Sequence, residues 1–138
     1  MKKKFQKYMW ENGFELKIQV LDDQHKKFIA ILNLLVDAIN QDEVNKKIPQ
    51  IFFKLMNHAE DYFLQEEILL KKYPESNLDD IQKDHQDFII RIANFQNQFS
   101  KKEESIASDL LEFLDSWLKN RINNYNKQTI FYLQTGTK

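Results

Sequence analysis

Four stretches of the chain carry apolar residues at intervals of three and four positions, the spacing that places them on one face of an α-helix. Helix-breaking residues are nearly absent from these stretches, because the glycines are Gly13 and Gly136 and the prolines are Pro49 and Pro74. The pattern therefore predicts four amphipathic helices rather than a sheet. The positions on these four faces, nearly all apolar, are Phe28, Ile29, Leu32, Leu35, Val36 and Ile39; Ile51, Phe52, Leu55, Ala59, Tyr62, Phe63 and Leu70; Leu78, Ile81, His85, Phe88, Ile92, Phe95 and Phe99; and Ile106, Leu110, Leu111, Leu114, Trp117, Leu118, Ile122 and Tyr125.

Local signals suggest where some of these helices begin and end. Asp22 precedes the first apolar stripe, and we expect it to be an N-cap, since its side chain can accept a backbone N–H. The second helix should begin between Glu43 and Pro49, because proline is tolerated in a first helical turn. It should end before Pro74, which pushes the preceding residue out of helical geometry.

Short polar connections between the stretches make consecutive helices antiparallel. The sequence therefore predicts an all-α fold, an up-down-up-down antiparallel four-helix bundle with an extended N-terminal arm. We expect a single domain over residues 1–138, with the arm at 1–21, the bundle at 22–127 and a C-terminal tail at 128–138.

Several polar residues fall on the predicted inner faces of these helices. Facing helices with inward histidines and carboxylates are the usual way in which bundles build two-iron sites. A lone inward histidine is more often a hydrogen-bonded core residue, and buried charges such as Glu66 and Arg121 each need a partner. His58 is interpreted as such a packed histidine rather than a ligand. The inward polar set is His25, His58, Tyr62, Glu66, His85, Arg121 and Asn126.

Composition removes several function classes. The 20 basic and 21 acidic residues nearly cancel, so no bulk field favours nucleic acid. Cysteine is absent, which excludes disulfides and thiolate ligands and fits a cytoplasmic protein. No apolar run is long enough for a membrane span, so we expect no membrane insertion. The sequence contains no phosphate-binding loop, nucleophile elbow or H-E-x-x-H motif, and we expect no enzyme activity.

The inward polar residues lie within motifs that resemble those of the bacterial hemerythrins, and the resemblance runs over nearly the whole chain. Residues 10–18 (WENGFELKI) and 21–26 (LDDQHK) are similar to the family's arm and to its D-x-Q-H-K helix start. Residues 62–67 (YFLQEE) resemble H-F-x-x-E-E, and residues 81–88 (IQKDHQDF) resemble H-x-x-x-H-x-x-F. Residues 117–126 (WLKNRINNYN) resemble W-L-x-x-H-I-x-x-x-D.

The resemblance implies a site of five histidines and two bridging carboxylates that holds two irons and reversibly binds oxygen. This chain keeps three of the seven ligand types, His25, Glu66 and His85. The other four positions hold Tyr62, Ile81, Arg121 and Asn126. Isoleucine cannot ligate a metal, arginine has no free lone pair and stays charged, and asparagine offers a neutral oxygen in place of a bridging anion.

These replacements favour a hypothesis in which a salt bridge takes the place of the metal. Arg121 and Glu66 would point into the same cavity from different helices, where a guanidinium can pair with the carboxylate. Tyr62 and Asn126 would satisfy remaining polar groups, and Ile81 would add apolar packing. The chain would then hold no cofactor and act as a structural or interaction module with a protein partner.

Two alternatives stay open at this stage. His25, Glu66 and His85 supply two nitrogens and a carboxylate, the ligand types of a mononuclear iron or zinc site, to which Tyr62 could add a phenolate. The hemerythrin-like metal- or oxygen-binding function would then persist in reduced form. The second alternative is a pH sensor that uses His25 and His85 near Glu66.

Overall fold

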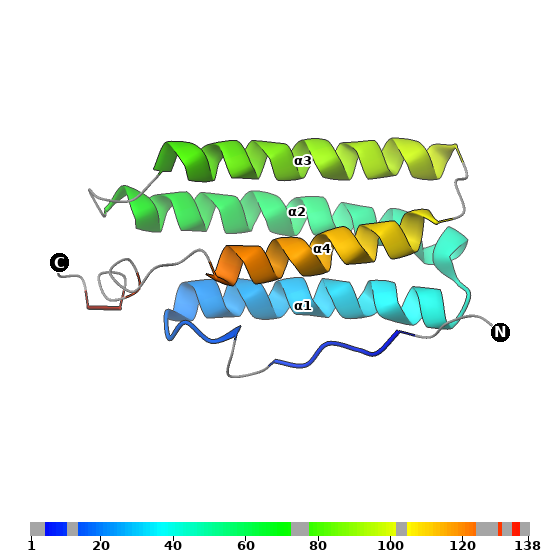
Figure 1. Cartoon of the computed structure of the whole chain (residues 1–138), viewed down its shortest axis with the longest axis horizontal. Coiled ribbons are helices and arrows are strands. Elements are labelled where there is room, and N and C mark those ends of the chain that lie inside the picture. The colour runs from blue at the N-terminus through cyan, green and yellow to red at the C-terminus, as the bar shows by residue number, and fades with distance from the viewer. Residues whose placement is uncertain are drawn as a thin grey trace.

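The computed structural model describes residues 5–10, 14–72, 78–101, 105–123, 130 and 134–135. Within this part of the chain there are four helices and no strands. Successive helices lie side by side and run in opposite directions (Figure 1), which confirms the predicted all-α, up-down-up-down bundle. None of the described helices combines the length and apolar character needed to cross a bilayer. The helices are α1 (Gln19–Asn40), α2 (Val44–Lys71), α3 (Leu78–Ser100) and α4 (Ile106–Asn123).

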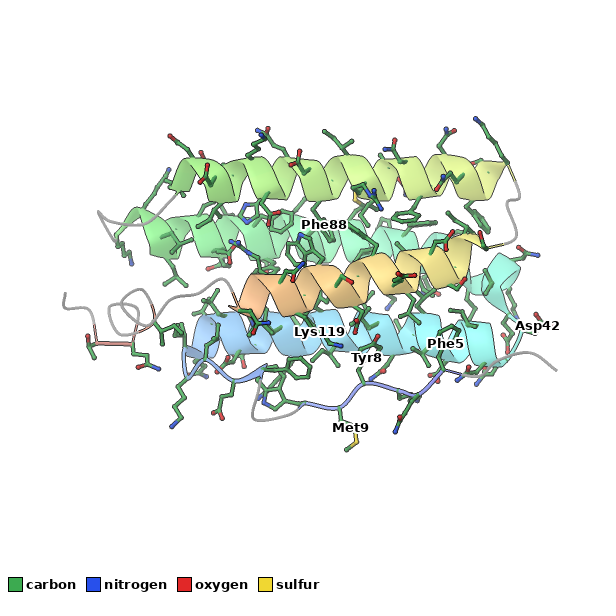
Figure 2. All side chains as sticks on the ribbon, viewed as in Figure 1. Phe5, Tyr8, Met9, Asp42, Phe88 and Lys119 are labelled. Carbon is green, nitrogen blue, oxygen red and sulfur yellow. The ribbon has the colours of Figure 1, made fainter. Side chains whose placement is uncertain are left out.

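The four apolar stripes meet in one continuous core, and aromatic rings form its middle. Phe88 of α3 lies inside the bundle (Figure 2), with its ring centroid 4.6 Å from that of Trp117 on α4. Trp117 in turn stacks on Phe28 of α1 at 5.6 Å, and Phe63 of α2 meets Phe88 edge-on at 5.4 Å. Each helix thus contributes one large ring to the same layer. This layer lies directly against the buried polar side chains of the bundle.

The start of α1 differs from the prediction, because Asp22 is not an N-cap. The helix begins at Gln19, and Ile18 in the cap position makes no side-chain capping bond. Asp22 lies in the first turn instead, where its carboxylate accepts the backbone N–H of Leu16 at 2.8 Å and of Lys17 at 3.0 Å. Lys17 has a positive φ of 58°. The carboxylate therefore holds the sharp turn by which the arm enters the helix.

The second helix begins at Val44, inside the predicted interval, and ends at Lys71, before Pro74 as predicted. Pro49 is nevertheless the sixth residue of α2 and lies in its second turn, not its first. A proline there cannot donate a hydrogen bond to the carbonyl one turn earlier, which weakens the start of the helix locally.

The N-terminal arm runs back along α1 in the opposite direction (Figure 1). Its inner part is anchored firmly, since Leu16 and Ile18 are buried in the core. A residue near the other end of the sequence also contacts this inner part of the arm, because Gln134 donates its side-chain amide to the carbonyl of Leu16 at 2.8 Å. Ile130 also packs against the core. The predicted boundaries of the arm, bundle and tail remain predictions.

We expect Asp22→Ala to lower the free energy of unfolding by roughly 2–3 kcal/mol, because the N–H groups of Leu16 and Lys17 lose a charged acceptor. Asp23→Ala is the matched control, since Asp23 is exposed, and it should cost less than about 0.5 kcal/mol. Urea unfolding followed by circular dichroism measures both. Equal effects of the two substitutions would contradict the role assigned to the Asp22 carboxylate.

Candidate functional site

Five polar side chains from all four helices meet in the interior of the bundle. They come from one position on α1, two positions one turn apart on α2, and one position each on α3 and α4. All five are at least nine-tenths buried, so each needs a polar partner. They are His25, Tyr62, Glu66, His85 and Arg121, the predicted inward residues of each helix.

Glu66 is the centre of this cluster. Its Oε1 atom accepts a hydrogen bond from Nη2 of Arg121 at 2.5 Å and lies 2.6 Å from Nε2 of His85. The side chain of Glu66 is completely buried and that of Arg121 is 6% exposed. The ion pair between Arg121 and Glu66 that the sequence predicts is therefore present, and His85 joins it.

His85 lies between two carboxylates. Its Nε2 faces Glu66, while its Nδ1 is 2.9 Å from Oε2 of Glu67. A neutral imidazole has one N–H, so two carboxylate acceptors are both satisfied by the doubly protonated ring. Phe63 stacks flat on His85 with ring centroids 3.9 Å apart, which places a negative π-face against that ring. Both ring nitrogens of His85 thus lie against carboxylate oxygens.

Glu67 continues the network toward solvent. Its Oε1 accepts the side-chain amide of Gln82 at 2.9 Å, and its Oε2 faces His85. Burial would raise the pKa of Glu67, but the hydrogen bonds from Gln82 and His85 outweigh burial and lower that pKa. Glu67 is therefore held as a carboxylate at neutral pH.

Tyr62 connects the ion pair to the first helix. Its hydroxyl is hydrogen-bonded to Arg121 and lies 2.6 Å from Nε2 of His25. Because arginine can only donate, we assign the hydroxyl hydrogen of Tyr62 to the lone pair of His25 Nε2. Burial raises the pKa of Tyr62 well above its usual value, so the phenol stays protonated.

His25 is correspondingly neutral. Burial lowers its pKa to about 4 and outweighs the opposing charge of Glu66. With Nε2 accepting from Tyr62, the ring hydrogen is on Nδ1, a buried atom with no hydrogen-bond partner among the described residues. A continuous chain of polar contacts therefore runs from His25 through Tyr62 and Arg121 to Glu66, and on to His85.

The remaining predicted positions lie around this chain. Ile81 is partly buried, one turn before His85 on α3. His58 packs its ring 5.8 Å from that of Tyr62, as predicted for a core histidine, and burial lowers its pKa to about 4. Nε2 of His58 is buried and has no hydrogen-bond partner in the described part of the chain. Asn126 lies outside the described residues.

Sequence reasoning had not assigned a role to three residues that belong to the network. Glu67 and Gln82 hold the outer side of His85, and Asp84 Oδ2 lies 3.7 Å from Nη1 of Arg121. Burial raises the pKa of Asp84 despite the nearby guanidinium. The sequence does contain a signal for two of them. Glu67 directly follows Glu66, and Gln82 lies one turn before His85 on the same helix, so both are near enough to contact these inward residues.

These side chains do not fit a two-iron centre. The guanidinium of Arg121 is bonded to the carboxylate oxygen that would have to bridge the metals, and a fixed positive charge there repels a dication. The donor nitrogen of His25 is engaged by the hydroxyl of Tyr62. Among the described residues, no group of three or more histidine, cysteine, aspartate or glutamate side chains is arranged to hold a metal ion.

The lowered pKa values of His25 and His58 predict a loss of stability in acid. Between pH 6.5 and about 4 the unfolded chain binds protons at these histidines that the folded chain does not bind. Their contribution to the free energy of unfolding is therefore fully present above pH 6.5. It is lost as the pH falls toward 4, which lowers the free energy of unfolding by up to about 3 kcal/mol for each histidine. Urea unfolding at pH 7, 5 and 4 measures this loss.

His58→Gln is the informative comparison for this prediction. It should leave a smaller difference between pH 7 and pH 4 than the unchanged chain has, because one of the two histidines has been removed. The carboxylates, including Glu67 and Asp84 with their opposite pKa shifts, are common to both proteins and cancel. An unaltered pH dependence would contradict the assignment.

Comparison with known proteins agrees with this arrangement of helices and motifs. Residues 16–129 match the family described as "Hemerythrin HHE cation binding domain". Bacteriohemerythrin of Pseudomonas paraeruginosa is 29% identical over 116 residues, which cover 84% of this chain and 74% of that protein. Bacteriohemerythrin of Clostridium acetobutylicum is 27% identical, covering 89% and 98%, and myohemerythrin of Theromyzon tessulatum is 26% identical, covering 83% and 84%. No solved structure matches the chain. Since the family match spans most of its length, the chain belongs to the hemerythrin family.

Proposed function

We propose that this hemerythrin-family domain works without a metal and serves as a structural or protein-interaction module rather than as an oxygen carrier or an enzyme. The ion pair of Arg121 and Glu66 takes over the role that a cation would have in neutralising the buried carboxylate. The bundle keeps the family's fold, and its function then depends on its surface.

The observation that carries this proposal is that Oε1 of Glu66 already has two close nitrogen partners. Two nitrogens, Nη2 of the permanently charged Arg121 and Nε2 of His85, already lie within 2.6 Å of this one oxygen. A dication would have to displace at least one of them, and a displaced guanidinium would remain buried beside the incoming positive charge. Burial of an uncompensated charge costs several kcal/mol, so the metal-free arrangement is the favoured one.

The neighbouring replacements support the same proposal. Tyr62 accepts from Arg121 and donates to His25, so the side chain at a former ligand position completes the new network. Ile81 offers no donor atom. A mononuclear iron or zinc site on His25, Glu66 and His85 is the competing function. It would require Arg121 to leave and Tyr62 to turn away from His25.

Arg121→Met should lower the free energy of unfolding by about 3 kcal/mol or more, because Glu66 loses its permanent positive partner while staying buried. Adding Glu66→Gln to this variant should restore much of the loss, since no buried charge is left unpaired. Chemical denaturation of both variants measures the coupling. Arg91→Met, at an exposed arginine stacked on Phe113, is the control and should cost less than about 1 kcal/mol.

Unchanged stability of Arg121→Met would show that Glu66 does not depend on the guanidinium. Bound iron or zinc in the Arg121→Met protein, with none in the unchanged chain, would instead support the idea that the arginine substitutes for a cation.

Metal content tests the proposal directly. The chain purified from medium supplemented with iron and zinc should contain less than about a tenth of an equivalent of either metal and show no visible colour. Its melting temperature should be the same with a chelator, with iron(II) and with zinc, because a metal that binds only the folded state would raise it. Near one equivalent of metal that is lost in His25→Ala or His85→Ala would establish the mononuclear site instead.

A further inference from the structure

The outer arm, residues 5–10, is held on the surface of α1 through its main chain. Asn40 donates its side-chain amide to the carbonyl of Phe5 at 2.7 Å and accepts the N–H of the same residue at 2.8 Å. Asn33 makes the same pair of bonds with Tyr8, at 2.9 Å and 2.7 Å. Each asparagine thus bonds both the N–H and the C=O of one arm residue, as the facing residue of a neighbouring antiparallel strand would, whatever the side chain of that arm residue.

The spacing of the two asparagines matches an extended chain. Asn33 and Asn40 are seven residues apart, which on a helix is about 10.5 Å along the axis. Phe5 and Tyr8 are three residues apart, which in an extended segment of polyproline II geometry is one full turn of about 9 Å, so both residues present their main-chain groups to the same side. The two pairs of bonds therefore fit an extended segment of this geometry.

Side chains of the outer arm add selectivity. The ammonium of Lys7 lies 3.1 Å from Oδ2 of Asp37 on α1, and the hydroxyl of Tyr8 is hydrogen-bonded to Asp115 on α4. Lys26 lies over the ring of Trp10, 5.1 Å from its centroid. The arm therefore contacts both helices. On α1 it meets one acidic side chain and one cation, and on α4 it meets a second acidic side chain.

The outer arm can be separated from the rest of the fold. None of residues 5–10 is fully buried, and Met9 is 74% exposed. Figure 2 shows Phe5 and Tyr8 on the side of the arm that faces the bundle and Met9 on the opposite side. The inner part of the arm is anchored independently, by Asp22 and by the burial of Leu16. Release of the outer arm would leave the buried core intact, as expected of a segment with low local stability.

We propose that the surface of α1 and α4 beneath the outer arm is a binding site for an extended peptide segment of a protein partner. The segment would carry an aromatic residue, a lysine followed by a tyrosine, and a further aromatic residue, in the spacing of Phe5, Lys7, Tyr8 and Trp10. The chain's own arm occupies the site and competes with the partner. Recognition by main-chain bonds, with side-chain contacts adding specificity, is a common way to bind such segments.

This inference deepens the proposed interaction role, and its test is independent of metal content. The probe is a fluorescent peptide with the sequence of residues 3–12, titrated into the full-length chain carrying Phe5→Ser and Tyr8→Ser, which weaken the competing arm. Fluorescence anisotropy should report saturable binding. Adding Asn33→Ala and Asn40→Ala should weaken binding at least tenfold, whereas adding Asn57→Ala, at an exposed asparagine of α2, should leave it unchanged.

A second control acts on the peptide. N-methylation of its tyrosine nitrogen removes the N–H that Asn33 accepts while every side chain is kept, and it should weaken binding to the unchanged Asn33 but have little further effect once Asn33→Ala is present. Circular dichroism and melting of each variant confirm that the bundle is folded.

Absence of binding to the folded variant with the weakened arm would overturn the inference, and so would binding that ignores the asparagine substitutions. A dimer of the unchanged chain, seen by light scattering and lost with Asn33→Ala and Asn40→Ala, would assign the site to a second copy and not to a foreign partner. A metal-free chain that fails to bind the peptide overturns this inference alone. Bound metal in a chain that binds it overturns only the proposed loss of metal.

Discussion

A fully buried carboxylate governs the interior of this bundle. Glu66 has no contact with solvent, and an ion in such a place is stable only when opposite charge and hydrogen bonds compensate for its lost hydration. Arg121 of α4 supplies the opposite charge, and Nε2 of His85 on α3 contacts the same carboxylate oxygen. Around them Tyr62 accepts a hydrogen bond from the guanidinium, and Glu67 lies against the second nitrogen of His85. The identities of these side chains therefore follow from one requirement, the neutralisation of a single negative charge.

The same requirement explains how the site relates to the fold of the hemerythrin family. A four-helix bundle presents inward positions from each helix at one level, and such positions can ligate metals or bond to one another. In this chain the donor atoms are directed at each other. The bonding of His25 is incomplete, because one ring nitrogen bonds to Tyr62 while the other is buried without a partner among the described residues.

Much of the fold was predictable because it depends on repeated apolar spacing, which a sequence displays directly. The four helices and the pairing of Arg121 with Glu66 follow from inward positions and opposite charge. The use of Asp22 did not follow, since a capping carboxylate and one that binds the preceding turn have the same local sequence. The bonds from Asn33 and Asn40 to the arm were also missed. An asparagine on the outer face of a helix has the pattern of an ordinary solvent-exposed residue. The arm residues to which these two asparagines bond, Phe5 and Tyr8, lie far away in the sequence.

The shared dependence on Glu66 has a consequence for how substitutions combine. Arg121, His85 and Tyr62 are linked through one network of contacts, so the effects of their substitutions on stability are coupled rather than additive. Replacing Arg121 by histidine alone would strand the carboxylate before any metal ligand set is complete, while Ile81 and Tyr62 would still supply no imidazole. A histidine at this one position would therefore cost stability without completing a two-iron ligand set.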